Sequence, residues 1–298
     1  MAVRRVNNYL CMIDLRPANI ERFSASYILK GEKTAIIECG PASCVDNLVK
    51  GLKELEVHPE EVDYVMVTHA HVDHWGSAGA LLKYLPEAKL VVHPVGLPHL
   101  ANPQKLWLQS KQVLGEIAEI FGQPFPVPTE RMVPAQNGMV IDLGEGLEIQ
   151  VVETLGHAPH HVSYYERKNR TLFPGETAGV YVEDLAVTLP ATPPPIMLNK
   201  LFESLEKLLR LNPKMLCYTH FGLVPNASEM LRAYIKQLNV WASTIHEALE
   251  NRENIDSVRE RLMERDPNLK FASEYVKTHP IISRVFSSLI QGFMTSAK

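Results

Sequence analysis

Short apolar runs alternate with stretches of helical periodicity along the first half of the chain. Two runs of β-branched and aromatic residues, 27–29 and 34–37, flank a polar segment and predict a β-hairpin. Apolar residues at helical spacing between 44 and 55 then predict a helix, and the run 62–68 predicts a buried strand. The alternation continues with a helix predicted at 77–84, a strand at 89–93 and a helix at 106–121.

The second half begins with β-type patterns and ends in helices. Several short strands are expected between 132 and 173, where an Asn-Gly and an Asn-Arg dipeptide mark turns. An amphipathic helix at 198–209 and a strand at 215–219 follow. Because strands and helices interleave twice, and each half begins with strands, the pattern predicts two mixed sheets packed together with helices outside. This architecture is an α/β sandwich.

Apolar positions continue at helical spacing beyond residue 226. The segments are 227–249, 255–265 and 281–293. We therefore expect a helical C-terminal extension, residues 226–298, packed on the rest of the chain. Such an extension could cap a pocket or form the contact of a homodimer, and the periodicity does not choose between these alternatives.

Charge and composition exclude several classes of protein. Of the 298 residues 46% are hydrophobic, and 30 Lys and Arg against 34 Asp and Glu give a formal net charge of −4. Without a basic excess, neither nucleic acid nor a membrane surface is an expected partner, which leaves a small-molecule substrate. The apolar runs are far shorter than the roughly 20 residues of a membrane-spanning helix, and residues 1–14 show no signal-peptide pattern. We expect a cytoplasmic protein, with its four scattered cysteines reduced.

Histidine and aspartate gather in one short segment. Residues 68–74 read THAHVDH, so four possible metal ligands lie within six residues, directly after a predicted strand. A loop leaving a strand can turn His69 and His71 toward one ion, and Asp73 and His74 toward a second. Because each ion needs three or four ligands, further ligands must come from distant parts of the chain.

Two more histidines follow predicted strands. His157 follows the run 147–153 in the sequence GHAPHH, and His220 ends the sequence YTH after the run 215–219. Imidazole and carboxylate at strand ends are ligands that zinc accepts, and a site with positions open to water is catalytic rather than structural.

The pattern HxHxDH with single later histidines resembles the metallo-β-lactamase-fold superfamily over roughly residues 24–225. The resemblance implies a four-layer αββα sandwich as the catalytic domain, residues 1–225, with the helical extension packed on it. It also implies two divalent metal ions between the sheets, with Zn2+ expected and Fe or Mn as alternatives. By the same resemblance, one ion is held by His69, His71 and His157, and the other by Asp73, His74 and His220.

Glu176 departs from the pattern of the superfamily. A carboxylate usually bridges the two ions and is an aspartate in most relatives, whereas this chain has FPGETAG at 173–179. Glutamate carries the same charge on one more methylene, so Glu176 can bridge both ions, bind only one, or not be a ligand. Glu38, in the sequence ECGP, stands where relatives often have an aspartate that supports the site from behind.

The other histidines have ordinary interpretations. His161 matches a histidine that normally supports the ligand loop in relatives, and His160 replaces what is often glycine, although either could reach into the pocket. His93 is expected to have a structural role. We expect four more histidines to be ordinary surface or core residues, namely His58, His99, His246 and His279. The proline-rich run 190–195 predicts a rigid surface loop that could border the site.

The expected metal pair defines the chemistry. Two cations about 3.5 to 4 Å apart lower the pKa of a shared water to near 7, so a bridging hydroxide becomes available as the nucleophile. Asp73 is expected to act as ligand and proton acceptor, and Tyr181 and Tyr218 as hydrogen-bond donors to the oxyanion. The sequence thus predicts a dinuclear metallo-hydrolase of a small ester, lactone, thioester or phosphoester, with scope for promiscuity. Such an enzyme is similar to the acyl-homoserine lactonase and glyoxalase II branches.

An iron oxidoreductase on the same fold is the alternative. Persulfide dioxygenases of the superfamily keep one iron, which would suit a second site weakened at Glu176. Flavodiiron proteins usually replace a ligand histidine with a carboxylate and append a flavin domain, whereas His71 is intact and no such domain is expected. A nuclease would require a basic face, which the net charge of −4 does not favour.

Overall fold

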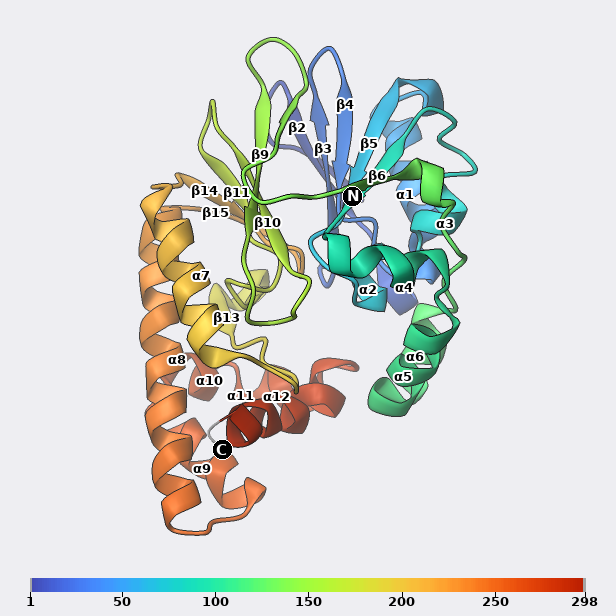
Figure 1. Cartoon of the computed structure of the whole chain (residues 1–298). Helices are drawn as coiled ribbons and strands as arrows, with labels where there is room; N and C mark the ends of the chain where they lie inside the picture. Colours follow the sequence, from blue (N-terminus) through green and yellow to red (C-terminus); the bar gives the residue numbers. More distant parts are fainter. Residues whose placement is uncertain (1, 297–298) are drawn as a thin grey trace.

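The computed structural model describes residues 2–296 as two β-sheets that face each other between layers of helices (Figure 1). The first sheet has seven strands in chain order, antiparallel from β1 to β4 and parallel from β4 to β7. They are β1 (Val3–Arg5), β2 (Leu10–Asp14), β3 (Ala25–Lys30), β4 (Thr34–Ile37), β5 (Val62–Met66), β6 (Lys89–Val92) and β7 (Met132–Pro134). The predicted hairpin is confirmed, because β3 and β4 pair with Tyr27 opposite Ile37.

The second sheet has six strands in the order β15-β14-β11-β10-β9-β8, and β12 and β13 form a separate hairpin. The strands are β8 (Val140–Asp142), β9 (Glu148–Glu153), β10 (Val162–Glu166), β11 (Thr171–Phe173), β12 (Val180–Val182), β13 (Val187–Leu189), β14 (Met215–Cys217) and β15 (Leu223–Pro225). All neighbouring strands in this six-stranded sheet are antiparallel except β11 and β14, which are parallel. The mixed character expected of both sheets is therefore confirmed.

Alternate side chains of each sheet face different apolar layers. On β3, Ile28 packs with the side chains of α1 (Val45–Glu54), whereas Tyr27 faces the second sheet. On β9, Val151 faces the first sheet, whereas Val152 packs toward α7 (Leu198–Arg210) and α8 (Ala227–Glu250). Three apolar layers thus separate helix, sheet, sheet and helix, and the predicted αββα sandwich is confirmed.

Apart from α1, the helices beside the first sheet differ from the prediction, because two short ones were not predicted and the others are shorter. They are α2 (Val72–Trp75), α3 (Ala78–Leu81), α4 (Leu97–Ala101), α5 (Gln104–Leu114) and α6 (Glu116–Phe121). The single helix predicted at 106–121 is wrong, because Gly115 adopts φ 56° and ψ −127° and separates α5 from α6. Apolar spacing continues across such a break, so the pattern alone does not reveal it.

The helical C-terminal extension is confirmed. After α8 it comprises α9 (Ile255–Arg265), α10 (Pro267–Phe271), α11 (Ser273–Thr278) and α12 (Ile282–Ser296), which lie below the sandwich in Figure 1. Trp241 of α8 packs on Phe293 of α12, with ring centroids 5.6 Å apart, in the same apolar cluster as the outer face of the second sheet. Within residues 2–296 we find no helix with the length and apolar character needed to span a bilayer. The four cysteines are buried free thiols, as expected.

Candidate metal centre

The loop after β5 and the short helix α2 carry the central group of side chains. His69 and His71 lie in the loop, and Asp73 and His74 lie on the single turn of α2. The indole N–H of Trp75 donates to a carbonyl of the loop at 3.1 Å and fixes the loop against this turn. The carboxyl end of the parallel strand β5 therefore positions four polar side chains, as the sequence predicted.

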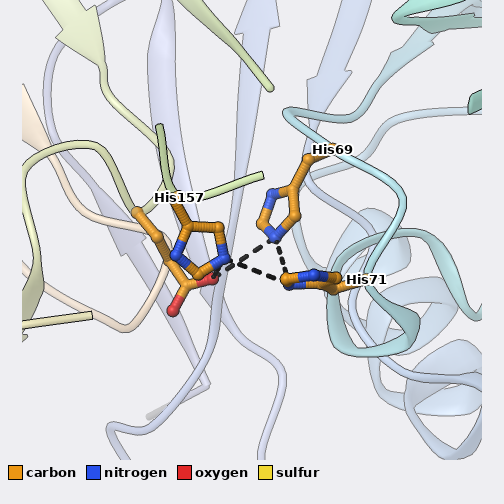
Figure 2. A group of neighbouring side chains, drawn as sticks. His69, His71 and His157 are labelled. Carbon is orange, nitrogen blue, oxygen red and sulfur yellow. Dashed lines mark hydrogen bonds and ion pairs between the residues drawn. The ribbon is translucent and has the colours of Figure 1, made fainter. Parts of the chain in front are cut away.

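Three imidazoles converge from the two halves of the sandwich (Figure 2). His69 Nε2 lies 2.9 Å from His71 Nδ1, which lies 3.1 Å from His157 Nε2. Oε2 of Glu176 lies 2.8 Å from His157 Nε2 and 3.3 Å from His69 Nε2. Ligand atoms around a tetrahedral zinc ion are about 3.3 Å apart, because zinc–nitrogen bonds are about 2 Å long. This first group therefore has the spacing of a metal site.

A second group consists of Asp73, His74 and His220. Oδ2 of Asp73 lies 3.8 Å from Nε2 of each histidine, and the three ligand atoms lie within 4.8 Å of one another. Two of these residues come from α2, and His220 comes from the turn between β14 and β15. The structure thus brings the seven residues of the predicted site together in the two groups that the resemblance implied.

Glu176 lies between the two groups. Its Oε2 is also 3.4 Å from His74 Nε2, and its Oε1 is 3.5 Å from His220 Nε2. The preceding Gly175 has φ 57°, and a Cβ there would lie 2.4 Å from His161 Nε2, so only glycine allows this approach. Nε2 of His161 accepts the backbone N–H of Glu176 at 3.2 Å. The longer glutamate therefore reaches both groups from a fixed backbone.

Hydrogen bonds orient three of the imidazoles. Nδ1 of His74, His157 and His220 each faces an oxygen outside the site. These oxygens are Oε2 of Glu38 at 3.0 Å, the carbonyl of Ala191 at 2.9 Å and the carbonyl of Phe23 at 3.3 Å, respectively. Because these oxygens accept, the ring proton lies on Nδ1, and each Nε2 turns a lone pair toward Glu176.

Acceptors therefore face acceptors at the centre of the site. Nε2 of His74 is buried and has no hydrogen-bond partner in the described part of the chain, residues 2–296. Nε2 of His157 and Nε2 of His220 also lie close to the Glu176 carboxylate, at 2.8 and 3.5 Å. Such an arrangement is repulsive unless positive charge, from protons or from metal cations, lies between the groups. Two divalent cations would supply that charge, and this donor set suits zinc, iron or manganese.

The ionisation of the site follows from the same contacts. Burial, followed by the charges of neighbouring histidines, holds the pKa of His69 and His71 well below the ordinary value. Burial alone would lower the pKa of His74 too, but three neighbouring carboxylates, that of Glu38 foremost, raise it well above the ordinary value. Burial would raise the pKa of Glu176, yet the surrounding histidines, His157 foremost, hold it well below the usual range. Glu176 is thus an anion, which favours a cation beside it.

Two further histidines support the ligand loops. Nδ1 of His161 lies 2.9 Å from Oγ1 of Thr154, and its Nε2 holds the backbone of Glu176. Nδ1 of His160 accepts the N–H of Ala70, between the first two ligands, at 3.2 Å. The supporting role predicted for His161 is confirmed, and His160 has a similar role.

Glu38 supports the site from behind, as expected. It is buried in the turn after β4, where its Oε1 accepts the backbone N–H of Thr68 at 2.9 Å and its Oε2 faces His74. Its φ of 63° is unusual for a residue other than glycine. Such backbone strain is typical of residues that the surrounding structure holds in place for function.

Tyr181 and Tyr218 belong to the apolar core. Their rings stack with centroids 5.0 Å apart. The hydroxyl of Tyr218 is buried and makes no hydrogen bond within residues 2–296. The side chain packs in the same apolar cluster as the hairpin β12–β13. This burial does not favour the predicted role of Tyr218, which stays a prediction. Tyr181 is 8% exposed, and its role stays a prediction.

Sequence reasoning missed the two carbonyls that orient His157 and His220. A backbone carbonyl can come from any residue, so neither Phe23 nor Ala191 carries a sequence signal. The run 190–195 was the one available hint, since it was expected to border the site. It is not simply a surface loop, however, because Ala191 and Thr192 are buried.

Comparison with known proteins identifies the class. Residues 20–220 match the family described as the metallo-beta-lactamase superfamily, and the chain belongs to this superfamily. The metallo-beta-lactamase fold-containing protein ST1585 of Sulfurisphaera tokodaii is 29% identical over 227 residues, which are 74% of this chain and 81% of that protein. The crystal structure of ST1585 has a TM-score of 0.68 at 25% identity and covers 90% of this chain and 99% of that chain.

Other relatives are matched over part of their length. The probable metallo-hydrolase YqjP of Bacillus subtilis is 25% identical over 167 residues, 50% of this chain and 51% of that protein. The putative diflavin flavoprotein A 1 of Thermosynechococcus vestitus is 29% identical over 158 residues, 52% of this chain and 24% of that protein. The matched region thus spans about half of the first relative and about a quarter of the second.

Proposed function

We propose that this chain is a dinuclear metal-dependent hydrolase that acts on a small ester, lactone, thioester or phosphoester. The observation that carries the proposal is the position of Glu176, whose two carboxylate oxygens lie 2.8 Å from His157 Nε2 and 3.5 Å from His220 Nε2. A carboxylate that spans both groups would keep two ions close enough to act on one substrate.

The side chains would divide the work between metal binding and proton transfer. One ion would be held by His69, His71 and His157, the other by Asp73, His74 and His220, with Glu176 shared. When bound, such a pair supplies an activated water near neutral pH and polarises the bond under attack. Asp73, with a side chain that is 22% exposed, can accept the proton of the attacking water and pass it to the leaving group.

Membership of the superfamily and the match to YqjP support hydrolysis as the class of reaction. The half-buried Asp73 and the donor set support metal chemistry, and they do not favour one bond type over another. The bond type is therefore a question for a substrate panel.

Metal content and turnover test the proposal together. In protein purified without added metal, we expect close to two ions per chain, with hydrolysis of at least one class in a panel of esters, lactones, thioesters and phosphoesters. Glu176→Gln keeps the size but loses the charge, so it should hold one ion or fewer and lose on the order of 100-fold in kcat/KM. Glu176→Asp keeps the charge but has a shorter side chain that cannot approach both groups, so it should also bind fewer ions.

The matched control is Glu166→Gln, which removes a buried charge at the far end of β10. It should keep two ions and full activity. Two ions with no turnover of any bond class would contradict the hydrolase assignment and leave the metal centre standing.

An iron oxidoreductase is the second candidate, favoured by a match to the flavo-diiron protein FprA2 of Clostridium acetobutylicum, which is 29% identical over 77 residues, 26% of this chain and 19% of that protein. The same histidine and carboxylate ligands accept iron. A single iron per chain, no hydrolysis, and oxygen consumption with a persulfide would support this function over the first. Two zinc ions and hydrolysis would exclude it.

A further inference from the structure

The orientation of His157 depends on a buried loop outside the metal centre. Its Nδ1 donates to the Ala191 carbonyl at 2.9 Å, and this carbonyl lies in the segment between β13 and α7. Ala191 and Thr192 are almost completely buried. Whatever fixes this segment therefore fixes the direction of the Nε2 lone pair of His157.

The C-terminal extension fixes this segment at three points. The backbone N–H of Ala191 donates to the Tyr234 hydroxyl of α8 at 3.3 Å, and Oγ1 of Thr192 donates to the Leu289 carbonyl of α12 at 3.0 Å. The third point is Gly292 of α12, where an added Cβ would lie 1.8 Å from the Thr192 carbonyl oxygen. Only glycine allows the helix to approach the loop so closely.

We propose that α12, through Gly292 and Thr192, positions His157 and sets the metal affinity of the first group while leaving the second group unaffected. This inference rests on the metal centre of the proposed function, but not on which bond the enzyme cleaves. It gives the C-terminal extension a role in the site, although none of its residues belongs to either ligand group.

The asymmetry between the two groups follows from their separate supports. His220 is oriented by the Phe23 carbonyl and His74 by Glu38, and both supports belong to the first sheet or its loops. The ring of Phe23 contacts His279, just before α12, with centroids 5.1 Å apart, but this contact lies about three helical turns from Gly292. A methyl group at residue 292 would push the Thr192 carbonyl away by about 1 Å, since close-packed interiors leave no free space. The adjacent Ala191 carbonyl would move with it, and His157 would lose the acceptor that holds its ring.

Stepwise zinc titration against a chromophoric chelator tests this inference on the full chain. Gly292→Ala should bind one of its two ions about 10- to 100-fold more weakly, as is typical when the partner of a ligand histidine is lost. The other ion should bind as in the unmodified protein. The two binding steps are assigned with His157→Gln and His220→Gln, which remove one ligand from the first and the second group, respectively.

Two further variants separate positioning from general destabilisation. Phe293→Leu removes part of a buried ring that packs on Trp241, on the same helix as Gly292, so it should lower stability and leave both zinc affinities unchanged. Thr192→Val removes only the hydrogen bond to α12 and should weaken the same ion about threefold to tenfold. It also provides the test if Gly292→Ala does not fold.

The outcomes distinguish failure of the inference from failure of the proposed function. Equal weakening of both ions in Gly292→Ala, or unchanged affinities in folded Gly292→Ala or Thr192→Val, would overturn the role of α12. An unmodified protein that binds no zinc would overturn the metal centre itself. Two normal zinc affinities without any hydrolysis would affect only the proposed reaction.

Discussion

At the scale of single residues, Glu38 determines which nitrogen of His74 faces the metal centre. Its carboxylate accepts from His74 Nδ1 at 3.0 Å and from the backbone N–H of Thr68 at 2.9 Å. In Glu38→Gln the amide NH2 would face one of these donors, and His74 can relieve the conflict by moving its proton to Nε2. We expect the ion of the second group to bind about 10- to 100-fold more weakly, measured by stepwise zinc titration.

Glu166→Gln serves as the control for Glu38→Gln, because it also neutralises a buried carboxylate but lies at the end of β10 away from the ligand loop. It should bind both ions normally. If Glu38→Gln weakened both ions equally, the effect would come from a general loosening and not from the tautomer of His74.

A second prediction at this scale concerns His279, which caps the start of α12. Its Nδ1 accepts the N–H groups of Ile281 and Ile282 at 3.3 and 3.2 Å. Burial, followed by the charge of His220, lowers the pKa of His279 to about 4. In the unfolded chain the His279 imidazole takes up a proton near pH 6.5, whereas in the folded chain it stays neutral down to about pH 4. The contribution of the neutral His279 to stability is therefore fully present above pH 6.5. It is lost progressively as the pH falls toward 4.

His279→Asn tests this pH dependence, because asparagine keeps a capping acceptor and does not titrate. Urea unfolding of the metal-free proteins at pH 7 and pH 4 should show that the original chain loses roughly 2 kcal/mol more than the variant. Identical losses in the two proteins would mean that His279 is protonated equally in the folded and unfolded states.

At the scale of elements, Asp266 connects the helices of the C-terminal extension. Its carboxylate accepts from Gln237 and Trp241 of α8 at 2.8 and 2.7 Å and from the first N–H groups of α10. Asp266→Ala leaves these buried donors without a partner and should lower the free energy of unfolding by about 3 kcal/mol in urea. Asp256→Ala, at an exposed residue in the first turn of α9, should change it by less than about 0.5 kcal/mol.

The length of each hydrophobic pattern determined which helices and strands could be predicted from the sequence. The helices at 198–209 and 227–249 offer three or more turns of apolar spacing, and their positions were anticipated closely. The strands β12, β13 and β15 have three residues each. Three residues are too few to distinguish an alternating hydrophobic pattern from chance. The strand β2, LCMID, is buried on both faces and therefore shows no alternation.

At the scale of the whole molecule, the sequence predicted which side chains converge better than it predicted the groups that orient them. His69, His71, Asp73 and His74 follow one strand in a local motif, so their proximity is a property of a short segment. The Ala191 carbonyl reaches His157 only because α8 and α12 fold against the loop that carries it. Such a support depends on tertiary packing, which no local pattern encodes.

Metal ions bound at this candidate centre would couple the stability of the molecule to its metal content. The expected ligands come from both halves of the sandwich. Nε2 atoms of four histidines lie 2.8 to 3.5 Å from the Glu176 carboxylate, namely those of His69, His74, His157 and His220. Each ion present at about 100 times its Kd should stabilise the folded state by about 2.7 kcal/mol. For a chain of this size, removing both ions should lower Tm on the order of 10 °C.

Calorimetry before and after treatment with a chelator, and again after zinc is restored, measures this shift. Glu176→Gln removes the charge that both ions would share, so zinc should raise its Tm less than that of the original chain. A Tm that does not respond to the chelator in the original chain would contradict a metal centre held between the two sheets.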